Sequence, residues 1–455
     1  MRKSVKYSTM ESLNFSVLVL AAGKGTRMRS TLPKVMHPLA GLPLIRHVLN
    51  AAETLTPKQI SVLIGEEMAD VAAVSKPHKT LLQKDRLGTG HAVQQGVAGG
   101  ALAEAEALVV LYGDTPLITP DTIQAMLAKL SQNPEAALVV LGFHTATPTG
   151  YGRLVVEHGA LQRIVEEKEA SEVEKKITFC NAGIMLFRSN VLPELLAKLD
   201  NNNQKQEYYL TDTIHHARNA GYTCLTVEAT AEEVLGINSK AELAQAENIL
   251  QQQLRAQALE QGVTLIVPET VFLSKDTTFG GDVVIEPNVF IGANVHLADG
   301  VHIKAFSHLE GATIGAHSTV GPFARLRAGT VLGKNVKIGN FVETKKATFG
   351  DEAKASHLSY IGDATVGNHA NIGAGTITCN YNGFTKAETV IGEGVFVGSN
   401  TALVAPITLE KGAIIGAGST ITQNVPADSL SLTRPPQTII TGWATAFRAR
   451  FKKEI

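Results

Sequence analysis

Apolar and polar positions follow two different patterns in the two halves of the chain. Up to about residue 240, short apolar runs alternate with amphipathic stretches. The runs cover 16–21, 108–112 and 137–142, and the stretches include 43–53 and 120–130. This alternation predicts an α/β domain with a mostly parallel sheet. Ligands of such sheets bind beyond the carboxyl ends of the strands, where the glycine-rich segment after Leu20 and the pair Gly113-Asp114 would lie.

A helix is predicted between the two patterns, over residues 239–261. Its apolar stripe consists of Leu243, Ala246, Leu250 and Leu254. Gly262 ends it. We interpret this helix as a connection. The predicted organisation is a flexible extension at 1–14, a first domain at 15–238, the connecting helix at 239–262 and a second domain at 263–455.

Beyond residue 263, aliphatic residues recur every six positions. They are Ile285, Ile291, Leu297, Ile303 and Leu309, then, after a one-residue slip, Ile314, Val320, Leu326, Leu332 and Ile338, and finally Ile391, Val397, Leu403, Leu409, Ile415 and Ile421. Many precede a glycine, as in Ile338-Gly339. Period six is typical of a hexapeptide parallel β-helix, with the aliphatic residue pointing into the core. A β-sandwich would show period two instead.

The period breaks between Ile338 and Ile391. Residues 345–360 and 379–388 lose the register. In a solenoid, such breaks are places where loops leave the surface, and these loops often carry function. The region in and around the breaks holds a set of polar and charged candidates, namely Arg327, Lys345, His357, Tyr360, Asn371, Asn380, Tyr381 and Lys386.

Composition narrows the classes of partner. The chain has 455 residues, is 44% hydrophobic and carries a formal net charge of -1, so no global field favours nucleic acid or an anionic membrane. The apolar run at 17–22 is too short for a membrane span or a signal peptide. Cys180, Cys224 and Cys379 are few, odd in number and far apart, which argues against a disulfide framework and favours a cytoplasmic location.

The segment at 20–34 carries the chemistry of the first half. Gly23 and Gly25 let backbone N–H groups approach phosphates, while Arg27 and Lys34 add positive charge. A lone glycine-rich loop is weak evidence, but Pro33-Lys34 at this spacing is more specific. With these residues the chain resembles the sugar nucleotidyltransferase (pyrophosphorylase) family.

From about Phe15 to the end, including the repeat, the chain resembles the bacterial bifunctional N-acetylglucosamine-1-phosphate uridyltransferase/glucosamine-1-phosphate acetyltransferase family. The resemblance implies a Rossmann-like nucleotidyltransferase domain followed by a left-handed parallel β-helix. It assigns UTP and UDP-N-acetylglucosamine to Leu20, Ala21, Ala22, Gly23, Lys34, Gln83, Gly88, Thr89, Tyr112, Gly113, Gly152, Glu166, Asn181 and Asn238. It assigns Mg²⁺ to Asp114 and Asn238, and catalysis also to Arg27 and Lys34.

These residue types suit the chemistry. In uridylyl transfer a sugar-phosphate oxygen attacks the α-phosphorus of UTP, and catalysis consists of positioning and charge neutralisation. Mg²⁺ prefers hard oxygen ligands, which Asp114 and Asn238 supply. A helix-capping role is the structural alternative for both residues, and a solvated face is the alternative for Glu166. One departure concerns Leu235, where the family usually has an acidic residue.

For the second half the resemblance implies acetyl transfer. Transfer of an acetyl group to an amine needs a base near neutral pH, which suits histidine, and the resemblance assigns this role to His357. The resemblance assigns binding of the sugar phosphate to Arg327, Lys345, Tyr360, Asn371 and Lys386. It assigns binding of acetyl-CoA to Ala374, Asn380, Tyr381, Ser399, Ala417 and Arg434. Asn382 stands where the family usually has Asp.

The implied function is synthesis of UDP-N-acetylglucosamine for bacterial cell-wall and lipopolysaccharide synthesis. The expected partners are small molecules, with no nucleic acid and no membrane insertion, and the resemblance implies a homotrimer formed through the β-helix. One alternative is a nucleotidyltransferase whose β-helix only regulates or assembles. A third class, the nucleotide-exchange subunits of translation factors, need not keep Lys34 or Asp114, which this chain has.

Overall fold

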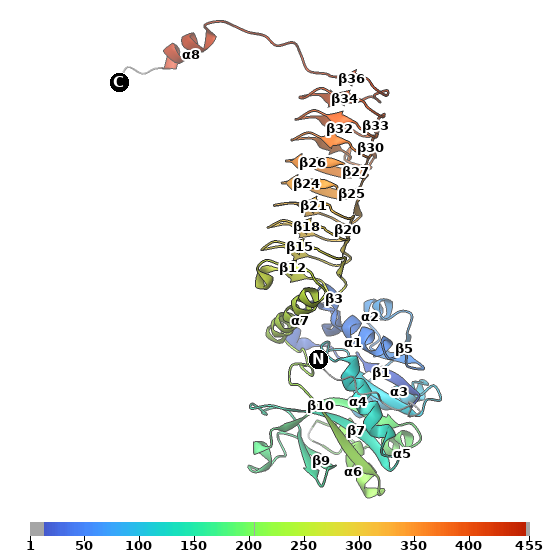
Figure 1. Ribbon diagram of the computed structural model, residues 1–455. Helices are drawn as coiled ribbons and strands as arrows, with labels where there is room; N and C mark the ends of the chain where they lie inside the picture. The colour runs from blue at the N-terminus through green and yellow to red at the C-terminus, as the bar shows by residue number, and fades with distance from the viewer. Residues whose placement is uncertain (1–12, 204, 452–455) are drawn as a thin grey trace. The chain divides into compact units, whose positions relative to one another are not determined.

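The computed structural model describes residues 13–203 and 205–451 (Figure 1). The predicted extension at 1–14 therefore lies outside these residues except for its last two. Of these, Asn14 is held by Glu106 through reciprocal hydrogen bonds of 2.9 and 2.8 Å. The chain separates into two compact units, the first ending at Gln252 and the second beginning at Gln253. This division lies inside a helix, so the predicted domain boundaries stay a prediction.

The first unit is built on a nine-stranded sheet with the order β11-β7-β10-β6-β1-β4-β5, to which β8 and β9 add a hairpin. The strands are β1 Phe15–Leu20, β4 Ile60–Ile64, β5 Lys79–Leu82, β6 Ala107–Tyr112, β7 Ala136–His144, β8 Arg153–Glu157, β9 Ala160–Val165, β10 Phe179–Arg188 and β11 Thr223–Ala229. A small hairpin joins β2 Pro38–Leu39 to β3 Leu42–Pro43. The three predicted apolar runs are β1, β6 and β7.

The sheet is parallel on both sides of one reversed strand. Strands β6, β1, β4 and β5 pair in parallel, as do β7 and β11. The strand β10 runs antiparallel between β6 and β7. The prediction of a mostly parallel sheet is correct for the half that contains β1, and the reversed strand is an addition to it. Because β1, β4 and β6 are parallel, the loops that follow Leu20, Ile64 and Tyr112 meet at one edge.

Helices cover both faces of this sheet, which gives a three-layer unit. Residues of α1, α2 and α4 belong to the apolar core on one face, and residues of α3, α5 and α6 belong to the core on the other. The helices are α1 Leu44–Glu53, α2 Ala69–Val74, α3 Thr89–Ala98, α4 Pro120–Ser131, α5 Leu192–Ala197 and α6 Thr213–Asn219. The predicted helices at 43–53 and 120–130 match α1 and α4.

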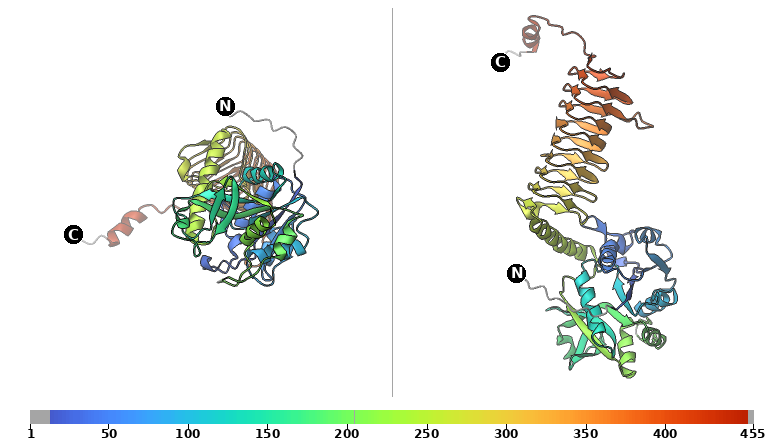
Figure 2. Two further views of the ribbon diagram at one scale, coloured as in Figure 1. Left: turned by 90° about the horizontal axis from the view of Figure 1, so that it is seen from below. Right: turned by 45° about the vertical axis from the view of Figure 1, so that its right-hand side comes forward.

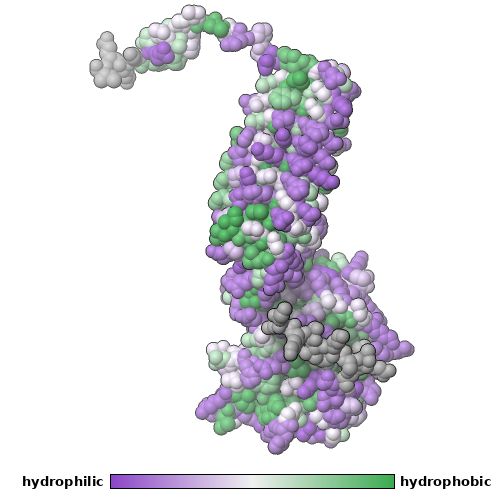
Figure 3. Space-filling model, in the orientation of Figure 1, coloured by the Kyte–Doolittle hydropathy of each residue, from purple (hydrophilic) through white to green (hydrophobic). Residues whose placement is uncertain are grey.

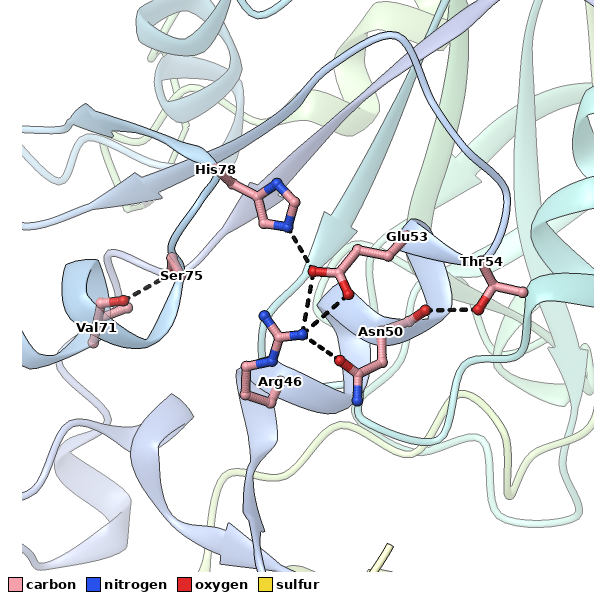
Figure 4. Close-up of polar contacts among 7 residues, drawn as sticks. All are labelled: Arg46, Asn50, Glu53, Thr54, Val71, Ser75 and His78. Atoms are coloured by element: carbon pink, nitrogen blue, oxygen red, sulfur yellow. Dashed lines mark hydrogen bonds and ion pairs between the residues drawn. The ribbon is translucent and has the colours of Figure 1, made fainter. Parts of the chain in front are cut away.

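A polar network ties the end of α1 to the start of β5 (Figure 4). The Glu53 carboxylate accepts hydrogen bonds from Arg46 at 3.1 Å and from the His78 ring at 2.6 Å, and Arg46 also donates to Asn50. Burial raises the pKa of Glu53, but the hydrogen bonds from His78 and Arg46 outweigh that effect and leave the pKa below its ordinary value. The ionised carboxylate therefore links helix and sheet at the edge opposite to the carboxyl ends of the strands.

The helix α7 spans Lys240–Glu260, close to the predicted 239–261. The Ser239 hydroxyl accepts a hydrogen bond from the N–H of Glu242, and the Glu242 carboxylate accepts one from the Ser239 hydroxyl, which caps the helix. Of the predicted stripe, Ala246, Leu250 and Leu254 are buried and Leu243 is partly buried.

The second unit is a left-handed parallel β-helix, whose coils are stacked in Figure 2. One face is the ten-stranded sheet β12 Thr264–Leu265, β15 Val284–Ile285, β18 His302–Ile303, β21 Thr319–Val320, β24 Lys337–Asn340, β26 Lys354–His357, β28 Asn371–Ile372, β31 Phe396–Val397, β34 Ile414–Ile415 and β36 Leu430–Ser431. The long strands β25 Glu343–Phe349 and β27 Tyr360–Val366 join the columns of the other two faces into one sheet.

The remaining strands of those two faces fall into two columns. The first column holds β13 Phe272–Leu273, β16 Phe290–Ile291, β19 His308–Leu309, β22 Arg325–Leu326, β29 Ile377–Cys379, β32 Ala402–Val404 and β35 Thr420–Ile421. The second holds β14 Thr278–Phe279, β17 His296–Leu297, β20 Ala312–Ile314, β23 Thr330–Leu332, β30 Thr389–Ile391 and β33 Ile407–Leu409.

The period-six residues form the core of the coils, as predicted. Each of the sixteen predicted aliphatic residues is at most 3% exposed. The glycines that follow them have a steric reason. A Cβ added to Gly339 would lie 1.9 Å from the Ser356 carbonyl oxygen of the next coil, and one added to Gly315 would lie 2.3 Å from the Gly333 oxygen. The backbones of successive coils approach too closely there for any side chain.

The two breaks in the period have different structures. At 379–388 the chain makes an excursion from the coil, closed by a hydrogen bond from Ala387 N–H to the Asn380 oxygen and by a bridge between Tyr381 and Lys386. At 345–360 no loop leaves, contrary to our interpretation. The coil continues, with Ala355 beside Ile338 at an inward position. The period is lost because some inward residues, such as Ala355, are small, and because the step between the inward residues Thr344 and Phe349 is five residues instead of six.

The surface of the β-helix is mixed, with apolar patches between polar ones on the face seen in Figure 3. The C-terminal helix α8, Trp443–Phe451, buries none of its side chains. Across residues 13–203 and 205–451, none of the helices is both long enough and apolar enough to cross a membrane.

Replacement of Gly339 by Ala tests the close approach of the coils. A methyl group at this position meets a backbone carbonyl, so we expect Gly339→Ala to destabilise the β-helix by about 1–3 kcal/mol. Thermal unfolding followed by circular dichroism should show a lower apparent melting temperature. The matched control is Gly281→Ala, where the nearest atom is 3.8 Å away. Equal melting temperatures for the two variants would contradict the steric explanation.

Candidate functional site

A cavity of about 330 Å³ opens at the carboxyl edge of the first sheet. Its wall combines the glycine-rich loop after β1, the loop before α3 and the end of β6. Ten predicted residues line it, namely Leu20, Ala21, Ala22, Gly23, Lys34, Gln83, Gly88, Thr89, Tyr112 and Asp114. Four residues that the sequence did not single out also line it: the charged Arg86 and Glu207, and the apolar Val35 and Ala92. The cavity thus gathers most of the predicted nucleotide site.

Glycines shape this cavity through close backbone approach. Gly88 has a φ of 108°, and a Cβ there would lie 2.6 Å from the Tyr208 oxygen. A Cβ on Gly25 would lie 2.5 Å from Cβ of Lys34, so glycine lets the loop pack against the root of that lysine. Arg86 donates from Nε to the Ala22 carbonyl at 2.6 Å, which fixes the glycine-rich loop to the segment before α3.

Lys34, in the wall of the cavity, places its ammonium between two side-chain oxygens. The Lys34 ammonium donates to the Asp114 carboxylate and, at 3.0 Å, to the side-chain oxygen of Asn238. The Lys34 and Asp114 side chains are only 14% and 17% exposed. A hydrogen bond of 2.9 Å from Ile237 N–H to the Asp114 carbonyl holds the two oxygen-bearing segments together.

These contacts argue against a helix-capping role for Asp114 and for Asn238. The N-cap of α4 is Thr119, whose side chain accepts from the Thr122 N–H, so Asp114 does not cap that helix. Ser239 caps α7, and the Asn238 side chain faces Lys34 instead. Asp114 and Asn238 therefore present hard oxygens around a point already suited to a positive ion. That donor set fits Mg²⁺, which typically takes one or two protein groups together with phosphates and water.

A second group of predicted residues lies next to Tyr112. Asn181 N–H donates to the Gly152 oxygen at 2.8 Å, and a Cβ on Gly152 would lie 3.5 Å from the Glu166 carboxylate. Burial raises the pKa of Glu166, whereas the nearby Lys168 is exposed. Glu166 is therefore not a residue of a fully solvated face. Burial also raises the pKa of Tyr112, with the charges of Asp114 and Glu166 adding to the effect.

Two predicted residues stand apart. Arg27 is exposed on the short 3₁₀ helix Thr26–Met28 and does not line the cavity. Gly113 lies below the cavity wall, where its N–H donates to the Leu20 oxygen at 3.0 Å. Leu235, at the position of the departure, is partly buried and donates its N–H to the Glu232 oxygen. The departure therefore leaves the Lys34–Asp114–Asn238 contacts intact.

The second site is organised along one corner of the β-helix. Backbone hydrogen bonds run from Leu358 N–H to Asn340, from Gly375 N–H to Leu358, from Asn400 N–H to Ala374 and from Gly418 N–H to Ser399. His357, Ala374, Ser399 and Ala417 thus follow one another on successive coils. Arg434 joins this corner by donating to the Ala417 oxygen at 2.7 Å. Most of the predicted acetyl-CoA residues therefore form a column that ends at His357.

His357 is exposed, and a neighbouring coil orients its ring. Its Nδ1 lies 2.6 Å from the side-chain oxygen of Asn340, the residue opposite it in the pairing of β24 with β26. An amide oxygen can only accept, so Nδ1 carries the proton and Nε2 is the basic nitrogen. Within the described residues, Nε2 has no hydrogen-bond partner. The spacing of 17 residues between adjacent coils was the signal in the sequence that could have revealed Asn340.

A group of cations lies on the adjoining face. Arg327 pairs with Glu343 at 3.0 Å, and Tyr360 lies opposite Glu343 in the sheet. Lys386, on the excursion, contacts Lys345 and holds the pKa of Lys345 below its ordinary value, and Arg327 adds to that effect. The three cations outnumber the two nearby carboxylates, Glu343 and Asp363, which favours binding of a phosphate group. The sequence reasoning missed Glu343.

Asn371 stands apart from this group within one chain. It belongs to β28 in the ten-stranded sheet, whereas Arg327, Lys345 and Tyr360 belong to strands of the other sheet. Asn380, by contrast, is 9% exposed and donates to the Asp363 carboxylate, which orients its amide. Tyr381 is exposed on the same excursion.

The structure explains why Asn is compatible with position 382. The Asn382 side-chain oxygen accepts hydrogen bonds from the N–H groups of Phe384 and Thr385, at 2.9 and 2.8 Å. An Asp carboxylate offers the same acceptor, so the turn can form with either residue.

Comparisons with known proteins match both halves. The family described as MobA-like NTP transferase domain matches residues 17–205, and the bacterial transferase hexapeptide family matches 311–346 and 388–423. The hexapeptide repeat of succinyl-transferase matches 282–309. The unmatched part between the two hexapeptide segments is the region in which the period breaks. Fold and sites together define a two-part transferase, with an NTP transferase domain and a hexapeptide-repeat β-helix.

Whole-chain relatives identify the family. A bifunctional protein GlmU from Azorhizobium caulinodans is 50% identical, covering 97% of this chain and 98% of its own length. The corresponding proteins of Paramagnetospirillum magneticum and Nitrobacter hamburgensis are 49% and 52% identical, over 97% and 95% of this chain and 98% and 96% of their own lengths. The chain belongs to the family of bifunctional GlmU proteins.

The lowered pKa of Lys345 predicts a pH dependence for anion binding. Lys345 is charged below its pKa, so phosphate should bind best at low pH and lose affinity as pH rises through that value. Lys386→Met removes the repulsion and should raise the pKa of Lys345 toward the ordinary lysine value. NMR titration of ¹³C-methylated lysines measures this directly. Lys346→Met is the control, and an equal shift of the Lys345 pKa in both variants would contradict the assignment.

Proposed function

We propose that this chain makes UDP-N-acetylglucosamine by two reactions. The β-helix transfers an acetyl group from acetyl-CoA to the amine of glucosamine-1-phosphate. The first unit then joins the product, N-acetylglucosamine-1-phosphate, to UTP and releases pyrophosphate. The observation that supports this proposal best is that one chain carries both the oxygen-lined nucleotide cavity around Lys34 and the column of residues that ends at an oriented His357.

In the uridylyl transfer, an oxygen of the sugar phosphate attacks the α-phosphorus of UTP, and the bond to the pyrophosphate oxygen breaks. The loop at 20–23 offers backbone N–H groups to the phosphates, and the group of Gly152, Glu166 and Asn181 is placed to hold the sugar. Mg²⁺, when bound at Asp114 and Asn238, supplies neutralisation of phosphate charge. Lys34 supplies a further positive charge to the leaving pyrophosphate.

In the acetyl transfer, the sugar amine attacks the thioester carbonyl, the carbon–sulfur bond breaks and CoA leaves as the thiol. The proton of the amine goes to Nε2 of His357, which Asn340 keeps free by holding the proton on Nδ1. His357 then gives that proton to the departing sulfur, which leaves as the CoA thiol. Arg327, Lys345 and Lys386 bind the phosphate of the sugar, and Asn380 is placed to donate to the thioester oxygen.

Release of free CoA thiol, with His357→Ala as the variant, tests the assignment. We expect wild type to release thiol from acetyl-CoA and glucosamine-1-phosphate, and the variant to lose acetyl transfer by about 10²–10⁴-fold, the contribution typical of a general base. Uridylyl transfer to N-acetylglucosamine-1-phosphate is the folding control and should persist in the variant. If wild type released no thiol but still made the UDP-sugar, the chain would be a nucleotidyltransferase whose β-helix only regulates or assembles.

We further propose a cytoplasmic homotrimer formed through the β-helix. Its support is a ridge of Phe306, Phe323, Phe341 and Leu358, which occupy one position on four successive coils next to His357. The three phenyl rings stack at 4.9 and 5.3 Å, and the four side chains are 46–60% exposed. All four have positive φ, where Asn or Gly is preferred. An exposed apolar ridge at strained positions is typical of a protein interface.

Sedimentation of wild type and Phe323→Asn tests the trimer. Asn suits a φ of 56° and removes the ring, so the variant should fold, dissociate to single chains and lose acetyl transfer while it keeps uridylyl transfer. A shared site explains that loss because Asn371 is separated from the cations in one chain. Monomeric wild type with full acetyl-transfer activity would refute the proposal.

A further inference from the structure

The Lys34 ammonium occupies the position between the two oxygens proposed for Mg²⁺. It donates to the Asp114 carboxylate and, at 3.0 Å, to Asn238. Both charged side chains are largely shielded from water. A monovalent and a divalent cation cannot share this position, because they repel each other and compete for the same lone pairs.

We propose that Lys34 is an internal counter-ion that closes the metal site until the nucleotide arrives. The inference rests on the proposed function, because it takes Asp114 and Asn238 as the metal-binding residues. The carboxylate is not left unpaired before the metal binds, since the lysine neutralises it. Metal can use Asp114 only after the ammonium has left it.

The nucleotide provides the force that moves the lysine. Lys34 lines the same cavity as Gly23 of the glycine-rich loop, where the phosphates are expected. Its Cβ packs directly over Gly25, so a rotation of the long side chain is enough to carry the ammonium from Asp114 toward that loop. Phosphate oxygens then replace the carboxylate as its partner. UTP and metal therefore bind cooperatively, because one ligand removes the cation that excludes the other.

The geometry favours a specific exchange of the Lys34 ammonium for the metal ion over a general effect of positive charge in the loop. Among the positive residues of the glycine-rich loop, Lys24 and Arg27 are exposed, and neither lines the cavity. The contact from Lys34 to Asp114 spans 80 positions of sequence and the contact to Asn238 spans 204. Removal of Lys34 should thus change metal affinity, whereas removal of Lys24 should not.

The experiment measures binding of Mn²⁺, as a paramagnetic substitute for Mg²⁺, to the full chain without nucleotide. Free Mn²⁺ is followed by electron paramagnetic resonance. We expect Lys34→Met to bind Mn²⁺ about tenfold more tightly than wild type, which corresponds to about 1.4 kcal/mol. Lys24→Met is the matched control and should bind as wild type does. Lys34→Met combined with Asp114→Asn should lose the gain.

A second variant of the same residue tests whether the result for Lys34→Met arises from misfolding. Lys34→Gln keeps a hydrogen-bond donor but no charge, and it should also bind Mn²⁺ more tightly, with circular dichroism confirming the fold. The inference is overturned if both variants bind Mn²⁺ no more tightly than wild type, or if Lys24→Met gains as much. The Mg²⁺-dependent uridylyl transfer of wild type separates the two proposals. Activity without a gain in the variants refutes only the counter-ion, and absence of activity refutes the proposed function.

Discussion

Parallel pairing of neighbouring backbone segments is the constraint on which both halves of this chain depend. In the first unit it brings the loops after β1, β4 and β6 to one edge, which places the glycine-rich loop beside Asp114. In the β-helix it stacks each residue over its counterpart on the next coil, which places Asn340 beside His357. Both candidate sites are therefore products of register, to which backbone of positive φ contributes locally, at Gly88 in the first and at Leu358 beside the second.

Charge is balanced differently at the two sites. In the nucleotide cavity the principal carboxylate already has a cation, so the resting site is close to neutral. On the β-helix, Arg327, Lys345 and Lys386 lie close together and Glu343 pairs with Arg327, while the contact with Lys386 lowers the pKa of Lys345. The first arrangement resists entry of a second cation, while the second attracts an anion. The two sites thus differ in the kind of ligand that must arrive first.

The sequence predicted what local pattern determines. Apolar runs located β1, β6 and β7, and period six located the coil core, because burial selects aliphatic side chains at those positions. The continuous coil at 345–360 escaped prediction because Ala355 is a small inward residue and because the step from Thr344 to the inward Phe349 is one residue short of six. The reversed β10 escaped because Asn181 and Gly183 interrupt its apolar run at a bulge. The contact from Lys34 to Asn238 depends on tertiary register. The charge pattern pointed to Lys34, but only the resemblance to a family pointed to Asn238.

The closed excursion at 379–388 has a consequence for how chains of this kind can change in length. A coil that is one residue shorter has to absorb the change between two inward positions, as in the five-residue step from Leu309 to Ile314, because the following side chains would otherwise turn outward. The coils therefore accept few changes in length. This restriction on length does not apply to the excursion, because the hydrogen bond from Ala387 N–H to the Asn380 oxygen closes it before the coil resumes. A change in the number of residues between Tyr381 and Lys386 would leave the stacked coils undisturbed and would keep both of these residues, which are assigned to ligand binding. Substrate preference at the rim of the site can therefore diverge while the scaffold stays fixed.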